Sequence, residues 1–71
     1  MKLAKIIRWD DCAWRLADDT RANPPVSTVV QYTYDMEEGC YVVYFPGYTA
    51  GCYIPISVLD EYFKDLTVET G

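Results

Sequence analysis

Strand, turn and helix signals follow one another between Gly39 and Leu66, and this stretch limits the possible folds more tightly than any other. Cys40 to Phe45 is β-branched and aromatic, which favours a strand. The Pro46-Gly47 dipeptide after it suits the centre of a type II turn, in which glycine takes the positive φ. Cys52 to Ile54 is then long enough for a short strand, which Pro55 ends because it has no N–H to donate. The stretch predicts two strands separated by a turn.

An amphipathic helix is predicted directly after these strands, from Ser57 to Leu66. Ser57 stands three residues before Asp60, which is typical of a capping box at a helix N-terminus. Apolar side chains then recur at helical spacing and form one stripe: Val58, Leu59, Tyr62, Phe63 and Leu66. We expect this stripe to pack on one face of a sheet.

The clearest strand pattern in the chain is Val26 to Tyr34. Alternate residues form one apolar face: Val26, Thr28, Val30, Tyr32 and Tyr34. The segment from Asp35 to Gly39 predicts a short hairpin loop, with Gly39 in the positive-φ position that closes such loops. Val26 to Tyr34 should therefore pair antiparallel with Cys40 to Phe45.

The N-terminal residues are harder to interpret. Loose alternation predicts a strand from Lys2 to Trp9, with three apolar residues on one face: Leu3, Ile7 and Trp9. A helix that places Leu3, Ile6 and Ile7 together is the alternative.

Asp10 and Asp11 can cap a short helix over Cys12 to Asp18, and this is the favoured interpretation of that segment. A strand with Cys12, Trp14 and Leu16 on one face, turning at the two aspartates, is the competing one. Arg21 to Pro25 is predicted as a linker-like loop.

These elements predict an α+β fold, in which a small antiparallel sheet of three or four strands carries the C-terminal amphipathic helix on one face. A small barrel-like sheet is the alternative architecture. With 71 residues there is room for a single small domain over residues 1–71.

Composition excludes several classes of function. Eleven acidic and six basic residues give a net charge of −5, which disfavours direct binding to nucleic acid. The absence of histidine removes the commonest general base, so we expect a protein that is not an enzyme. Three cysteines without a CxxC spacing indicate a reducing compartment, with neither cofactor nor metal. No signal-peptide pattern and no apolar run of about 20 residues is present, which predicts a cytoplasmic protein that does not bind membranes.

Acidic and aromatic residues are the candidates for a binding surface. No basic residue occurs between Ala22 and Phe63, so this part of the surface should carry a negative potential that steers the protein to a basic partner. Tyrosine is enriched at interfaces because it offers rigid area with a polar tip. The predicted partner-binding residues are Glu37, Glu38, Tyr48, Tyr44 and Tyr34, of which Tyr48 lies at the Pro-Gly turn.

Several segments resemble small phage-encoded proteins of unknown function. The segments that carry the resemblance are Ile6-Ile7-Arg8-Trp9, Gly39-Cys40-Tyr41-Val42-Val43, Tyr53, Pro55, and Leu59 with Phe63. They are similar to a first strand that ends in Trp, a Gly-x-Tyr strand, and a short aromatic strand followed by Pro and an aromatic helix. The spacing from Tyr53 to Leu59 differs by one residue, and Gly-Cys replaces the usual charged pair. The resemblance implies a mobile-element origin.

The leading hypothesis is a non-enzymatic acidic module that inhibits a host protein by covering a basic, nucleic-acid-binding surface. Anti-CRISPR proteins are one class with this size and charge. We expect a monomer or weak homodimer whose partner is a host protein with a basic surface. The alternative is a structural or accessory protein that self-associates through exposed aromatic residues.

Overall fold

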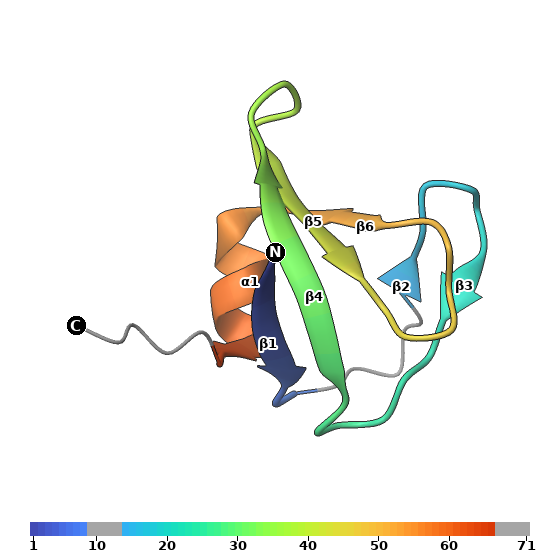
Figure 1. The fold of residues 1–71 in the computed structure, drawn as a ribbon, viewed down its shortest axis with the longest axis vertical. Helices are drawn as coiled ribbons and strands as arrows, with labels where there is room; N and C mark the ends of the chain where they lie inside the picture. The colour runs from blue at the N-terminus through green and yellow to red at the C-terminus, as the bar shows by residue number, and fades with distance from the viewer. Residues whose placement is uncertain (9–13, 67–71) are drawn as a thin grey trace.

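The described part of the chain is built around a five-stranded antiparallel sheet with the strand order β6-β5-β4-β1-β7 (Figure 1). The computed structural model describes residues 1–8 and 14–66. The strands of this sheet are β1 (Lys2–Ile6), β4 (Val29–Asp35), β5 (Cys40–Tyr44), β6 (Cys52–Ile54) and β7 (Phe63–Asp65). A second sheet pairs β2 (Trp14–Arg15) with β3 (Arg21–Ala22), and the helix α1 covers Ile56–Tyr62.

The β4–β5 hairpin has the pairing that the sequence predicts. Tyr32 faces Val43 and Tyr34 faces Tyr41 across an antiparallel ladder. Gly39 closes the loop with a φ of 70°, a conformation that glycine adopts without strain. Gly47 also has a positive φ, 85°, and the Tyr48 N–H donates to the Phe45 carbonyl at 3.2 Å, which confirms the predicted turn.

The core lies on one face of this sheet. Its buried side chains include Ala4, Ile6, Val30, Tyr32, Val43, Phe45, Cys52, Ile54, Leu59 and Phe63. In β1 the buried residues are Ala4 and Ile6, whereas Leu3 and Ile7 are exposed, so the predicted face of this strand was wrong. The reason is register: Ala4 pairs with Val30, and paired residues point to the same side of a sheet. Trp9, which was predicted to lie on the same face as Leu3 and Ile7, lies outside the described residues.

The C-terminal helix is shorter than predicted. Helix α1 ends at Tyr62, and Pro55 is its N-cap without a side-chain cap hydrogen bond, so the predicted capping box of Ser57 and Asp60 is wrong. The Pro55 carbonyl instead accepts from the N–H groups of Val58 and Leu59, at 3.0 and 3.2 Å.

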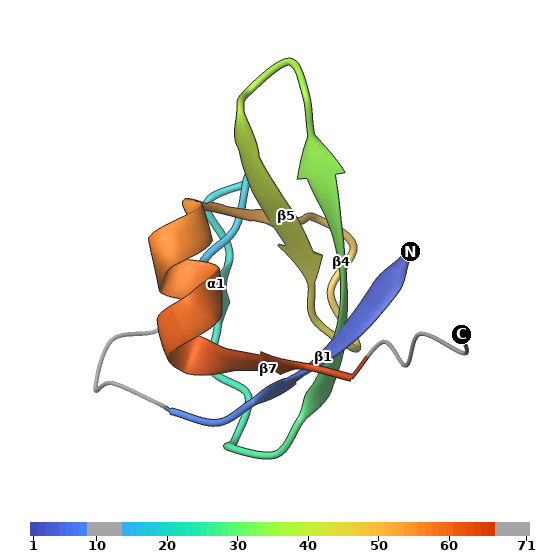
Figure 2. The ribbon, with the colours of Figure 1, turned by 90° about the vertical axis from the view of Figure 1, so that its left-hand side faces the viewer.

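The chain leaves α1 at Phe63 with extended backbone and continues as β7 beside β1, as Figure 2 shows. The Tyr62 carbonyl accepts from the Ile7 N–H at 2.9 Å, and the Leu66 N–H donates to the Leu3 carbonyl at 2.8 Å. An edge of β1 thus offers backbone partners to β7, in which Phe63 and Asp65 are weaker helix formers than Lys64. Pairing with β1 replaces the predicted last turns of helix.

The segment after residue 13 is also not the predicted helix. Trp14–Arg15 is strand β2, and a turn at Asp19 (φ 66°) returns the chain to β3. Within the predicted loop from Arg21 to Pro25, Ala22 is fully buried in β3. The Trp14 ring lies 6.1 Å from that of Phe45 and 5.5 Å from that of Phe63, so packing on the core determines this segment.

The predicted α+β architecture is therefore corrected. Within residues 1–8 and 14–66, five strands, not three or four, form the main sheet, a second two-stranded sheet is present, and only one short helix accompanies them. The described residues contain no helix with the length and apolar character that crossing a membrane requires.

Candidate functional site

The loop that joins β4 to β5 projects from the body of the protein, at the top of Figure 1. The Asp35 carboxylate orders it, because its Oδ1 accepts from the N–H groups of Glu37 at 3.0 Å and Glu38 at 3.2 Å. The Gly39 N–H donates to the Asp35 carbonyl at 2.8 Å. These local bonds hold the backbone of the loop in one conformation, so Glu37 and Glu38 are presented from an ordered tip.

A hollow beside this tip is lined mainly by tyrosine and methionine residues, and its strand residues Lys2, Tyr32, Tyr34 and Tyr41 lie on the core side of the sheet. We call this surface the hairpin site; its residues are Met1, Lys2, Tyr32, Thr33, Tyr34, Met36 and Tyr41, which line a hollow of about 510 Å³. The Tyr34 ring meets the Tyr41 ring edge to face, with centroids 5.1 Å apart. Tyr34 remains 51% exposed and Met36 86% exposed, so apolar surface is open to a partner.

Tyr32 forms the buried floor of the hairpin site. Its ring centroid lies 5.7 Å from that of Tyr41. Burial raises the pKa of the Tyr32 phenol to about 12, and a hydrogen bond to the Asp65 side chain contributes in the same direction. The raised pKa keeps the phenol neutral well into the alkaline range, and the Tyr32 ring packs edge to face with that of Tyr41.

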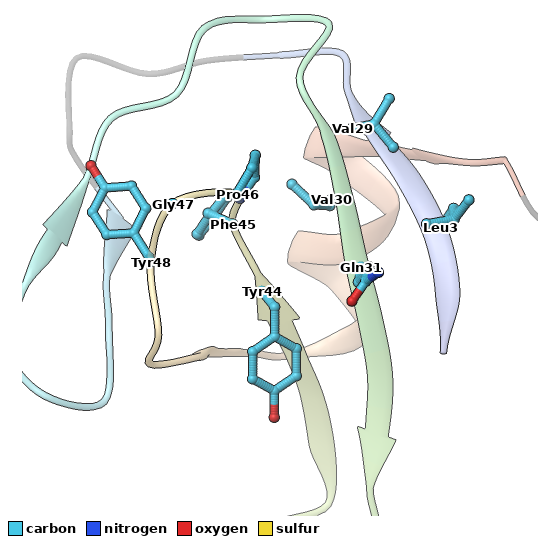
Figure 3. Close-up of a pocket in the computed structure, with 9 residues that line it drawn as sticks. All are labelled: Leu3, Val29, Val30, Gln31, Tyr44, Phe45, Pro46, Gly47 and Tyr48. Atoms are coloured by element: carbon cyan, nitrogen blue, oxygen red, sulfur yellow. The ribbon is translucent and has the colours of Figure 1, made fainter.

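A second hollow lies on the opposite side of the sheet. We call it the outer groove, and Figure 3 shows the residues that line it: Leu3, Val29, Val30, Gln31, Tyr44, Phe45, Pro46, Gly47 and Tyr48. Its volume is about 390 Å³. Leu3 and Val29 are 43% and 48% exposed along it. The groove is apolar on one side and carries the Tyr44 and Tyr48 rings on the other.

The predicted partner-binding residues divide between these two surfaces. Glu37, Glu38 and Tyr34 belong to the hairpin tip and the hairpin site, whereas Tyr44 and Tyr48 line the outer groove. The division follows from strand alternation, because Tyr34 and Tyr44 lie on opposite faces of the hairpin. The role of the five residues in binding a partner stays a prediction.

Sequence reasoning did not select Tyr41, Met36, Met1 or Lys2 for the hairpin site. The pairing of Tyr34 with Tyr41 could have been found, because a short loop from Asp35 to Gly39 sets the register of the hairpin. The position of Met1 and Lys2 depends on the pairing of β1 with β4, which joins segments distant in sequence.

The site has the chemistry of recognition. The hairpin site offers the tyrosine rings, the thioethers of Met1 and Met36 and the ammonium group of Lys2, and the adjacent tip adds the carboxylates of Glu37 and Glu38. Together these groups can bury apolar area and attract charged groups of a partner. Within residues 1–8 and 14–66, no group of three histidine, cysteine, aspartate or glutamate side chains could hold a metal ion. Cys40 and Cys52 are free thiols, and burial raises the pKa of Cys52 to about 11.

No protein-family model, no curated protein and no solved structure matches this chain. The resemblance to small phage-encoded proteins therefore stays a prediction.

Proposed function

We propose that this protein is a non-enzymatic acidic binding module that docks its β4–β5 hairpin on a basic surface of a partner protein. The observation that carries the proposal is the position of an ordered acidic tip next to exposed aromatic surface. Glu37 and Glu38 would steer the approach to a basic partner, and Tyr34 with Met36 would be buried on contact.

Inhibition is the most direct consequence of such docking. Proteins that handle nucleic acids attract phosphate with lysine and arginine grooves, and a projecting acidic hairpin can occupy such a groove. The partner is then a host protein met in the cytoplasm, in agreement with the resemblance to phage-encoded chains. A net charge of −5 favours this encounter at low ionic strength.

Affinity capture from a bacterial lysate, followed by displacement with double-stranded DNA, tests the proposal. The immobilised protein should retain a basic protein that DNA releases. Glu37→Gln with Glu38→Gln, or Tyr34→Ala alone, should lose it. Asp18→Asn with Asp60→Asn is the matched control, since it removes the same charge from exposed positions outside the hairpin. Retention of the same proteins by all variants, or indifference to DNA, would contradict the proposal.

A further inference from the structure

The sheet face opposite the core, here named the outer face, carries positive and negative side chains at different ends of its strands. Cross-strand partners place side chains on this face in successive rows. The first row is Lys64, Lys5 and Val29; the second is Leu3, Gln31 and Tyr44; the third is Thr33, Val42 and Tyr53; the fourth is Asp35 and Cys40. The tip with Glu37 and Glu38 follows. One end of the outer face is therefore basic and the other acidic.

The middle of the outer face is apolar enough to become buried. Leu3 and Tyr53, in the middle rows, are 43% and 50% exposed, and Val29, in the adjoining first row, is 48% exposed. The outer groove lies between Leu3, Val29 and Tyr44. The ion pairs among the described residues are Arg8 with Glu61 and Arg15 with Asp19. Lys5 and Lys64 take part in neither, so their charges are available to an incoming surface.

We propose that the outer face binds a second copy of this chain, and that a two-fold axis midway along the face places the basic end of each copy on the acidic tip of the other. Such an axis brings Lys5 and Lys64 opposite Glu37 and Glu38 twice, and packs the apolar middle rows together. The Debye length is about 8 Å at physiological ionic strength, so these local pairs outweigh the repulsion between the two net charges.

The size of the face sets the strength of the dimer. Five strands at about 4.8 Å spacing and six residues at about 3.4 Å give a patch of roughly 19 by 20 Å. That is roughly 400 Å² a copy, half of the about 800 Å² a side of a standard interface. The dimer is therefore weak and reversible. Because it covers Glu37 and Glu38, it excludes the partner binding proposed above; only this last consequence rests on the proposed function.

Charge reversal, measured by sedimentation equilibrium of the purified protein without any partner, tests the two-fold packing. Lys5→Glu with Lys64→Glu, and separately Glu37→Lys with Glu38→Lys, should each raise the dimer dissociation constant roughly tenfold, since like charges then oppose each other at both ends. Mixing the two variants should restore dimers, as mixed pairs, because the ends match again.

Attraction between proteins of opposite net charge does not explain why mixing the two variants should restore dimers. From −5, two Lys→Glu changes give −5 − 4 = −9, and two Glu→Lys changes give −5 + 4 = −1, so both variants stay negative. Arg15→Glu with Arg21→Glu and Asp18→Lys with Asp60→Lys reach the same net charges away from the outer face and should dimerise as the unaltered protein does.

Tyr34→Ala, which the proposed function needs for its partner, should leave the dimer unchanged. This separates the two surfaces in one experiment. A monomer at every concentration, reversals that behave as their controls do, or a mixture that stays monomeric would each overturn the proposed packing.

Discussion

Gly51 lies so close to Val42 that a Cβ atom at position 51 would come within 2.5 Å of the Val42 Cγ1. The same atom would lie 3.1 Å from the Tyr44 ring. Val42 is buried on the outer face and, being β-branched, has few rotamers to move into. Gly51→Ala should therefore lower the free energy of unfolding by about 1 to 3 kcal/mol.

Urea denaturation of Gly51→Ala measures this effect. Thr49→Ala, an exposed change in the same loop, is the control and should stay within about 0.5 kcal/mol of the unaltered protein. Equal urea midpoints for the two variants would mean that the Val42 and Tyr44 side chains shift to accommodate the added Cβ atom.

Phe63 joins β7 to the core, so its truncation should be costly. It pairs with Ile6 and its ring lies 5.5 Å from that of Trp14. Phe63→Ala should lower the free energy of unfolding by about 3 to 5 kcal/mol, and Leu59→Ala by about 2 to 5 kcal/mol. Ile56→Ala, at an exposed position of α1, should change it little. A Phe63→Ala midpoint equal to that of Ile56→Ala would disprove the packing of β7.

Tyr32 should make the protein less stable at alkaline pH. Its pKa rises from the ordinary 10.0 to about 12 on folding, so the folded state holds the phenolic proton more tightly. The stability that Tyr32 contributes to the folded state is fully present below pH 10 and is lost as the pH rises through about 12. At about 1.4 kcal/mol for each pKa unit, that contribution is roughly 3 kcal/mol.

Thermal denaturation across this pH range, for the unaltered protein and for Tyr32→Phe, measures the loss. The phenylalanine variant should lose less stability, because the group that ionises is gone. Identical pH profiles would show that Tyr32 titrates normally.

Binding kinetics should separate steering from anchoring at the hairpin. Glu37→Gln with Glu38→Gln should lower the association rate constant and reduce its dependence on salt, while Tyr34→Ala should mainly raise the dissociation rate constant. Tyr48→Ala, on the opposite face, should alter neither. Surface plasmon resonance with the captured partner at several salt concentrations would show this. A Tyr48 variant as weak as the Tyr34 variant would move the interface to the outer groove.

Cys52 should react with thiol reagents far more slowly than Cys40. It is buried, and burial raises its pKa to about 11, so the reactive thiolate is scarce at neutral pH. Mass spectrometry of labelled Cys12→Ser protein measures each rate, and both thiols should react alike in denaturant. Equal rates in the folded protein would show that β6 opens readily.

The β4–β5 hairpin shows how much of this fold local sequence determines. Asp35 and Gly39 hold the loop in one backbone conformation, and the alternation predicted from Val26 to Tyr34 selects the buried face of β4. The Pro46-Gly47 turn and the strand before Pro55 were predictable for the same reason. The acidic tip with Glu37 and Glu38 could also be predicted, because its geometry depends on adjacent residues alone. The predicted start of β4 was wrong, because the chain turns at Ser27 (φ 80°) and β4 begins at Val29.

Pairing between strands distant in sequence decided which face of β1 is buried and where the C-terminal helix ends. The face of β1 depends on whether Ala4 or Leu3 meets the core, and Lys2 to Ile6 carries apolar residues on both sides. Of the predicted stripe, Leu59 and Phe63 are buried, whereas the other three residues, Val58, Tyr62 and Leu66, are half-buried. Phe63 belongs to a strand because the open edge of β1 supplies backbone partners to Tyr62 and Leu66.

The division of the predicted binding residues between two faces, by contrast, follows from the local register that the loop from Asp35 to Gly39 sets. Tyr34 and Tyr44 look alike in sequence, but the ladder with Tyr41 and Gln31 places them on opposite sides of the sheet. Turn chemistry and alternation act over a few residues and can be read from the chain. Which edge pairs with which, and therefore which side chains meet, depends on contacts between distant segments that only the folded chain brings together.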